Sequence, residues 1–117
     1  MALFFQNRAS EIFGVDIHPA AKISGGVMID HATGVVIGET SVIDENVSIY
    51  QGVTLGGKGF ENGDRHPKIK SGVSIFASST ILGNITIEKN AKVAAGSLVL
   101  KDVKKNTTVA GIPAKEI

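Results

Sequence analysis

The sequence of 117 residues contains no cysteine and no tryptophan, and aromatic residues make up only 5% of it. The absence of cysteine excludes a disulfide framework, a thiolate metal site and a cysteine nucleophile. No apolar run approaches the roughly 20 residues of a membrane span, and the N-terminus lacks the order of a signal peptide. The formal net charge of +1 gives no reason to expect nucleic acid or a membrane as partner. These absences predict one soluble, cytoplasmic domain.

Aliphatic residues recur at every sixth position through most of the chain. The series are Ile17, Ile23, Ile29 and Val35; Ile37, Ile43, Ile49 and Leu55; and Ile69, Ile75, Ile81, Ile87, Val93 and Val99. The fourth residue after most of these aliphatic residues is small or β-branched, as at Ala21, Val47 and Ser79. Agreement at two offsets over most of the chain indicates a structural repeat.

A period of six fits neither a helix nor a simple alternating strand. It is typical of a triangular solenoid, with a short strand on each side and a turn at each corner, and about four coils fit between residues 17 and 104. The pattern resembles the hexapeptide-repeat family of left-handed parallel β-helices, and the resemblance supplies the hand. We therefore predict an all-β solenoid over residues 15–117. An all-β sandwich with coincidental spacing is the alternative.

Two segments depart from the repeat. Residues 1–14 carry apolar residues at helical spacing up to Gly14, which predicts one short N-terminal helix. Residues 56–68 are rich in glycine and charge and contain no aliphatic residue on the six-residue step. We expect the second segment to leave the solenoid as a protruding loop, and loops on rigid scaffolds often carry function.

The three histidines are the first candidates for chemistry. His18 and His31 are thirteen residues apart and His66 lies in the loop, so no two have the close spacing that a three-histidine zinc site normally shows. We therefore predict no metal site. An imidazole beside a carboxylate favours acid–base chemistry instead. Asp16 precedes His31 by fifteen residues, a little less than one coil, and so should lie near it around the solenoid.

Four segments in order, "FGVDIHPAAKI", "IDHATGVVIGET", "QGVTLGG" and "GDRHPKI", closely resemble the serine acetyltransferases. The resemblance covers residues 3–115. It implies that His31 is the general base, with Asp16 as its carboxylate partner. It also implies that Asp30, Arg65 and His66 line the amino-acid pocket, where Arg65 binds the substrate carboxylate and Asp30 faces the ammonium group.

The same resemblance implies acetyl-CoA as co-substrate and no permanently bound cofactor. The expected CoA contacts are Gly57, Ala77 and Lys92, in a groove between two solenoids. Glycine permits close approach of the backbone, so Gly56 and Gly57 are candidate oxyanion donors. Without a thiol in the chain, we expect direct transfer to the hydroxyl of L-serine in a ternary complex.

Partners also follow from the resemblance: a homotrimer, and O-acetylserine sulfhydrylase bound through the terminal Ile117. Family members carry a helical domain of which residues 1–14 would be the last helix. Phe76 stands where the family usually has glycine or alanine and could alter the CoA groove. Two alternative functions stay open, a hexapeptide acyltransferase for another acceptor such as a sugar, and a weakly active trimeric scaffold.

Overall fold

The computed structural model describes residues 16–30, 33–58 and 63–117. Within these ranges the chain forms fifteen short strands joined by turns and no helix. None of the described segments is a long apolar helix of the kind that could cross a membrane. The helix predicted over residues 1–14 lies outside the described residues.

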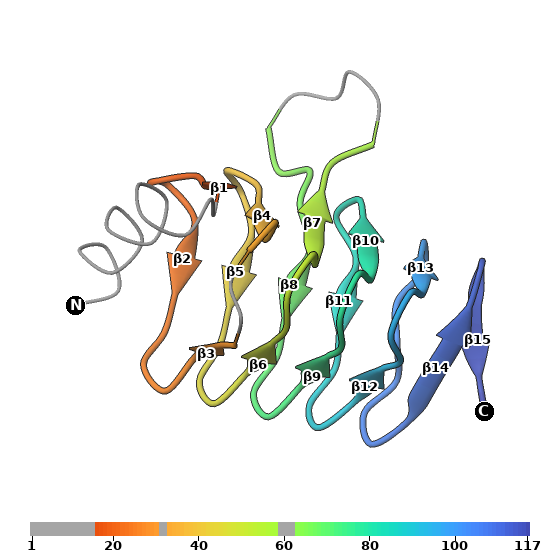
Figure 1. The fold of residues 1–117 in the computed structure, drawn as a ribbon. Coiled ribbons are helices and arrows are strands. Elements are labelled where there is room, and N and C mark those ends of the chain that lie inside the picture. The colour runs from red at the N-terminus through yellow and green to blue at the C-terminus, as the bar shows by residue number, and fades with distance from the viewer. Residues whose placement is uncertain (1–15, 31–32, 59–62) are drawn as a thin grey trace.

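The strands form three parallel sheets, one on each side of a triangular prism (Figure 1). Sheet A contains β1 (Asp16–Ile17), β4 (Val36–Ile37), β7 (Thr54–Gly56), β10 (Thr80–Leu82) and β13 (Leu98–Val99). Sheet B contains β2 (Lys22–Ile23), β5 (Val42–Ile43), β8 (Lys68–Ile69) and β11 (Thr86–Ile87). Sheet C contains β3 (Met28–Ile29), β6 (Ser48–Ile49), β9 (Ser74–Ile75), β12 (Lys92–Val93), β14 (Thr108–Gly111) and β15 (Ala114–Glu116).

Successive strands visit sheets A, B and C in turn, so three strands make one coil. Four complete coils lie between residues 17 and 104, as the repeat predicts. A fifth coil consists of β13, an isolated parallel bridge between Val103 and Ile87, and β14. The last strand, β15, turns back and pairs antiparallel with β14. The predicted parallel solenoid is confirmed.

The core is a stack of the predicted aliphatic residues. In sheet A, Ile37, Leu55 and Ile81 lie in register and are at most 1% exposed. Successive side chains along a strand point to opposite faces, so a strand of two residues contributes one side chain to the core. The second offset also points inward, since Val47, Ser79 and most other residues of that series are buried. The aliphatic residues and the residues four positions after them therefore both mark the core in the sequence.

Two insertions interrupt the 18-residue coil. Ile17 pairs with Ile37 and Ile29 with Ile49, twenty residues apart, so the first coil carries two extra residues. Ile43 pairs with Ile69, twenty-six residues apart, so the third coil carries eight extra residues. The first insertion falls between sheets C and A, in the C–A corner. The second falls between sheets A and B, in the A–B corner.

Candidate functional site

The C–A corner of the first coil carries two of the predicted site residues. Asp16 is the first residue of β1, and its main-chain N–H donates to the carbonyl oxygen of Val35 at 2.8 Å. Asp30 follows β3 directly, and its N–H donates to the carbonyl of Ile49 at 2.8 Å. His31 lies in the two-residue gap that the described residues leave at this corner. The predicted contact between His31 and Asp16 therefore stays a prediction.

The A–B corner carries the other half of the predicted set. β7 ends at Gly56 and β8 begins at Lys68, so Gly57, Arg65 and His66 belong to the segment between them. A Cβ atom at Gly57 would lie 3.4 Å from Nε2 of His66 and 3.3 Å from Cγ of Arg65. These three predicted residues thus lie together at one corner of the chain.

Thr40, which the sequence analysis assigned no role, holds the end of this loop. Its Oγ1 accepts the main-chain N–H groups of Arg65 at 3.0 Å and His66 at 2.9 Å. The same oxygen lies 2.8 Å from Nδ1 of His66, and the main-chain N–H of Thr40 donates to Nδ1 at 3.1 Å. One residue of the second coil therefore fixes two of the predicted pocket residues.

Glu39 orients the guanidinium of Arg65. Nη2 of Arg65 donates to Oε1 of Glu39 at 2.9 Å, and Nη1 donates to the carbonyl oxygen of Gly63 at 3.0 Å. The hydrogen bond from Arg65 and its positive charge hold the pKa of Glu39 below its ordinary value. Only part of the guanidinium fork is used in this way, since arginine has five N–H donors.

Lys68 fastens the other side of the loop. Its ammonium donates to the carbonyl oxygens of Thr40 at 3.1 Å and His66 at 2.6 Å, and to Oδ1 of Asp64 at 2.6 Å. The hydrogen bond from Lys68 lowers the pKa of Asp64. Three acceptors use all three donors of the ammonium group. Within the described residues, the ammonium group of Lys68 therefore serves to hold the loop in place.

His66 is buried, with 7% of its surface exposed. Burial lowers the pKa of His66, and the positive charges of Arg65 and Lys68 add to this effect. A Cβ atom at Gly38 would overlap the ring at Cδ2 and Nε2, so the ring occupies space that only glycine leaves open. The site therefore favours a neutral imidazole.

Sequence analysis missed Gly38, Glu39, Thr40 and Lys68. The first three stand together at the end of the quoted segment "IDHATGVVIGET", and Lys68 is the last residue but one of "GDRHPKI". These residue types are common in turns, so their identity alone does not indicate a functional role. Their place inside the two segments that carry the resemblance was the one signal that could have found them. Only the stacking of the second and third coils brings the two segments together.

The residues predicted to contact CoA lie on different parts of the chain. Gly57 is at the A–B corner, whereas Ala77 is at the C–A corner between β9 and β10, where its carbonyl accepts the N–H of Gly96 at 2.9 Å. Lys92 lies on β12 and is exposed. Next to Ala77, the half-buried ring of Phe76 stacks on Tyr50, with centroids 5.1 Å apart and planes 13° apart.

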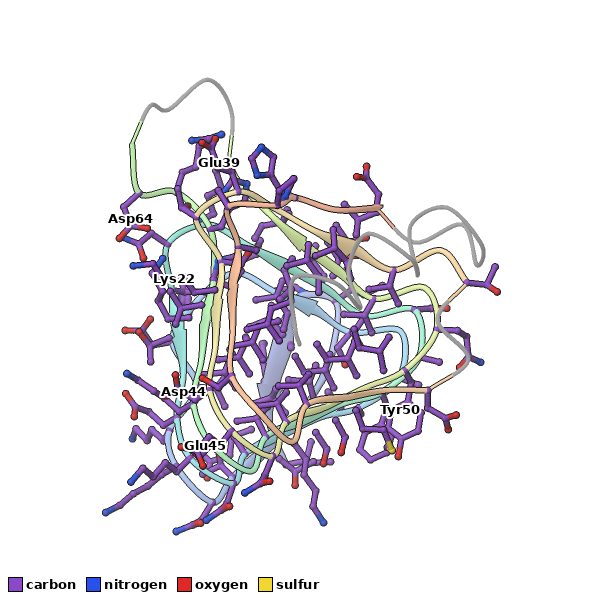
Figure 2. The ribbon with its side chains drawn as sticks, turned by 90° about the vertical axis from the view of Figure 1, so that its left-hand side faces the viewer. Lys22, Glu39, Asp44, Glu45, Tyr50 and Asp64 are labelled. Carbon is purple, nitrogen blue, oxygen red and sulfur yellow. The ribbon has the colours of Figure 1, made fainter. Side chains whose placement is uncertain are left out.

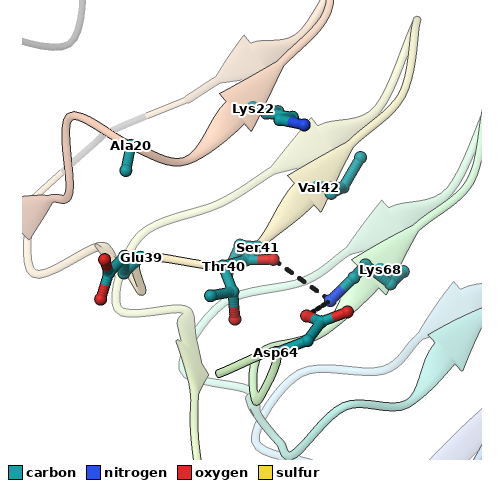
Figure 3. Close-up of a pocket in the computed structure, with 8 residues that line it drawn as sticks. All are labelled: Ala20, Lys22, Glu39, Thr40, Ser41, Val42, Asp64 and Lys68. Carbon is teal, nitrogen blue, oxygen red and sulfur yellow. Dashed lines mark hydrogen bonds and ion pairs between the residues drawn. The ribbon is translucent and has the colours of Figure 1, made fainter. Parts of the chain in front are cut away.

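An open cavity of about 340 Å³ lies on the sheet B side of Thr40 (Figure 3). Lys22, Glu39, Asp64 and Lys68 line it. None of the predicted catalytic, acceptor or CoA residues among the described positions lines this cavity. It therefore adjoins the predicted acceptor pocket without being that pocket.

The two corners stand at opposite edges of sheet A. Val35 and Glu39 lie on either side of β4, and four steps of extended chain at about 3.3 Å per residue span about 13 Å. Asp16 and Asp30 therefore do not meet Arg65 and His66 on one chain. Among the described residues, no three side chains of histidine, aspartate or glutamate gather as a metal site.

No family model matches the chain. Serine acetyltransferase from Salmonella typhimurium is 59% identical over 115 residues, which make up 98% of this chain and 42% of that protein. The structure titled serine acetyltransferase in complex with coenzyme A, from Brucella abortus, matches with a TM-score of 0.92 and 58% identity over 99% of this chain and 46% of that one. The Neisseria gonorrhoeae serine acetyltransferase in complex with serine matches with a TM-score of 0.89 and 60% identity, over 99% and 47%.

The chain thus spans less than half the length of the curated relative and of both solved structures. These matches confirm the resemblance to the serine acetyltransferases and the left-handed sense of the β-helix. At this identity over 98–99% of its length, the chain is homologous to the part of these serine acetyltransferases that it matches.

Proposed function

We propose that the chain transfers the acetyl group of acetyl-CoA to the hydroxyl of L-serine, giving O-acetylserine for cysteine biosynthesis. The observation that carries this proposal is the A–B corner, where Arg65 and His66 are held side by side in a chain 60% identical to a serine-bound structure. The coenzyme A complex of the Brucella relative supports acetyl-CoA as the donor.

In this proposal Arg65 binds the carboxylate of serine. A guanidinium matches a carboxylate in shape and charge, and its bonds to Glu39 and Gly63 pre-orient it, which reduces the entropy lost on binding. His66 lies beside it in the pocket. Asp30, from the other corner, faces the ammonium group of the substrate.

The chemistry requires a base and an oxyanion site. His31, oriented by Asp16, takes the proton of the serine hydroxyl. The alkoxide oxygen bonds to the thioester carbon, the resulting tetrahedral oxyanion accepts N–H groups near Gly56 and Gly57, and the carbon–sulfur bond then breaks to release the CoA thiolate. Gly57, Ala77 and Lys92 hold CoA.

A homotrimer completes this site. The outward residues of sheet A are uncharged after the first coil, as at Val36, Thr54 and Leu98, whereas sheet B presents Lys22 and other charged side chains such as the labelled Asp44 (Figure 2). Contact between copies along sheet A sets the C–A corner of one beside the A–B corner of the next. The two halves of the predicted site then meet.

Thiol release from acetyl-CoA tests the function directly. We expect release that depends on L-serine and yields O-acetylserine, with a hexose as control acceptor. Thiol release with the sugar and not with serine would show that the acceptor is a sugar and not L-serine. No release with either would contradict the enzyme assignment and favour a scaffold.

Light scattering at micromolar concentration tests the assembly. We expect a particle of three times 12.2 kDa. A monomer would contradict the site as drawn, because on one copy the two halves lie at opposite edges of sheet A and do not meet.

The contact with O-acetylserine sulfhydrylase through Ile117 is a further part of the proposal. The Ile117 side chain is 80% exposed, while its main-chain N–H donates to the carbonyl of Thr108 at 2.9 Å. An aliphatic side chain beside a carboxylate mimics an amino-acid substrate. Calorimetry with the sulfhydrylase, comparing the chain with one lacking Ile117, should show heat only for the intact chain. Identical heats would contradict the contact.

A further inference from the structure

Thr40 connects two coils through a single hydroxyl group. It lies in the A–B corner of the second coil, between β4 and β5, and faces the end of the loop in the third coil. Lys68 also binds its carbonyl oxygen, so side chain and backbone of Thr40 all contact the loop end. Thr40 therefore holds the main chain at Arg65 and His66.

The hydrogen bonds of Thr40 constrain the protons on His66. A hydroxyl has one hydrogen to donate and two lone pairs to accept with. The N–H groups of Arg65 and His66 occupy both lone pairs of Oγ1. At the 2.8 Å contact with Nδ1, the hydroxyl can thus only donate. Nδ1 must therefore be the acceptor.

The main chain gives the same assignment independently. The N–H of Thr40 donates to Nδ1 of His66 at 3.1 Å, and a backbone N–H can never accept. Asp64 competes for the hydroxyl proton, since a bond with Thr40 contributes to its lowered pKa. The backbone contact does not depend on that competition. A neutral ring with a bare Nδ1 carries its hydrogen on Nε2.

The Nε2 edge of the ring faces two glycines. A Cβ atom at Gly38 would overlap Nε2, and one at Gly57 would lie 3.4 Å from it. The ring itself fills the space at Gly38, so an oxygen of a bound molecule would approach the N–H from the side of Gly57, which carries no Cβ. A donor at this place suits a carboxylate or carbonyl oxygen and does not suit removal of a proton.

We propose that Thr40 is a positioning residue that fixes His66 as the Nε2–H tautomer, so that His66 is a hydrogen-bond donor to an oxygen of the bound acceptor and not a second base. The role of the donor rests on the proposed function, whereas the tautomer does not. Burial and the neighbouring cations, which lower the pKa of His66, act in the same direction by keeping the ring neutral.

The tautomer is tested by nitrogen NMR of the histidine rings, because a protonated and a bare ring nitrogen differ in chemical shift and coupling. We expect a bare Nδ1 and a protonated Nε2 for His66 at neutral pH, in the wild type and in Thr40→Ser. Thr40→Val removes the hydroxyl and should lower the population of this tautomer. A proton on Nδ1 in the wild type would overturn the proposal whether or not any variant folds.

The role of the donor is tested by two substitutions that place an amide at different ends of the ring. His66→Gln puts its N–H₂ near the position of Nε2, and His66→Asn puts it near Nδ1. We expect the KM for the acceptor to be about tenfold higher for Asn than for Gln, the loss of one hydrogen bond of about 1.4 kcal/mol. An equal KM for the acceptor in the Asn and Gln variants would overturn the proposed donor role of His66. Absence of acetyl transfer in the wild type, with the expected tautomer, would contradict the proposed function alone.

Discussion

The C–A corner of the first coil and the A–B corner of the third both break the 18-residue period, and they do so differently. The C–A corner takes two extra residues, and Asp16 and Asp30 flank it through ordinary ladder hydrogen bonds to Val35 and Ile49. The A–B corner takes eight extra residues, and its end is fastened by side-chain bonds to Thr40.

The difference teaches how a β-helix adds chemistry without losing its core. The strands on either side of both insertions keep their register. A long insertion leaves several backbone groups without a ladder partner, and buried groups of that kind must be paired elsewhere. Thr40 and Lys68 supply those partners. The A–B corner should consequently be more sensitive to changes in its packing.

The largest expected effect belongs to the C–A corner. His31→Ala should lower turnover by about 10²–10⁴-fold, the usual contribution of a positioned general base. CoA binding should change little, because the base contacts the hydroxyl. Steady-state kinetics and CoA titration measure the two effects. Full turnover in the variant would contradict the assignment of His31.

The same variant shows whether the corners act within one chain or between chains. Co-production of equal amounts of His31→Ala and Arg65→Ala chains, assembled at random, gives trimers in which about a quarter of all sites combine one intact half from each variant. We expect activity near that fraction. Activity no higher than that of either variant alone would mean that the two corners do not combine across copies.

Arg65→Ala at the A–B corner should chiefly weaken serine binding. Loss of a charge-assisted pair costs roughly 1.5–3 kcal/mol, about ten- to a hundredfold in the KM for serine. Glu39→Gln is the matched control, since it removes the charge that orients the guanidinium and leaves the guanidinium itself. It should have a smaller effect. An unchanged KM for serine in Arg65→Ala would remove Arg65 from the pocket.

Gly38→Ala tests the packing of the A–B corner. The added Cβ overlaps the ring of His66, and overpacking of this kind costs about 1–3 kcal/mol in the free energy of unfolding. Gly25→Ala is the control, because nothing lies within 4 Å of its Cβ. Urea denaturation compares them. Equal stability of the two variants would show that the ring moves away without cost.

The smallest effect compares one inward serine from each type of corner. Ser79, at the C–A corner, donates to the carbonyl of Ala94 at 2.8 Å, so Ser79→Ala should cost about 1 kcal/mol. Ser41, at the A–B corner, is buried, and its Oγ has no hydrogen-bond partner among the described residues. Ser41→Ala should therefore be neutral or stabilising. Thermal unfolding of both measures the difference, and a larger loss for Ser41→Ala would reveal a partner for its hydroxyl.

The six-residue pattern was enough to predict a parallel β-solenoid, and the resemblance supplied its hand. Side-chain direction alternates along a strand, so the positions of Ile37, Leu55 and Ile81 in the sequence predicted which residues face the core. The break in the period after Leu55 likewise predicted the loop that leaves the solenoid. The identities of Arg65 and His66 came from the resemblance, since charged and imidazole side chains in a loop have no period of their own.

By itself, the sequence determined what recurs: the six-residue step, the inward aliphatic residues and the places where the step fails. Only the tertiary structure decided that Asp16 and Asp30 lie across sheet A from Arg65 and His66, and that Thr40 holds the loop end. The physical reason is that a period describes contacts along one column of the helix. Contacts such as that of Thr40 with His66, twenty-six residues away, lie outside these columns. They join a corner of one coil to a loop of the next, and a loop without a period offers no register from which its partners follow.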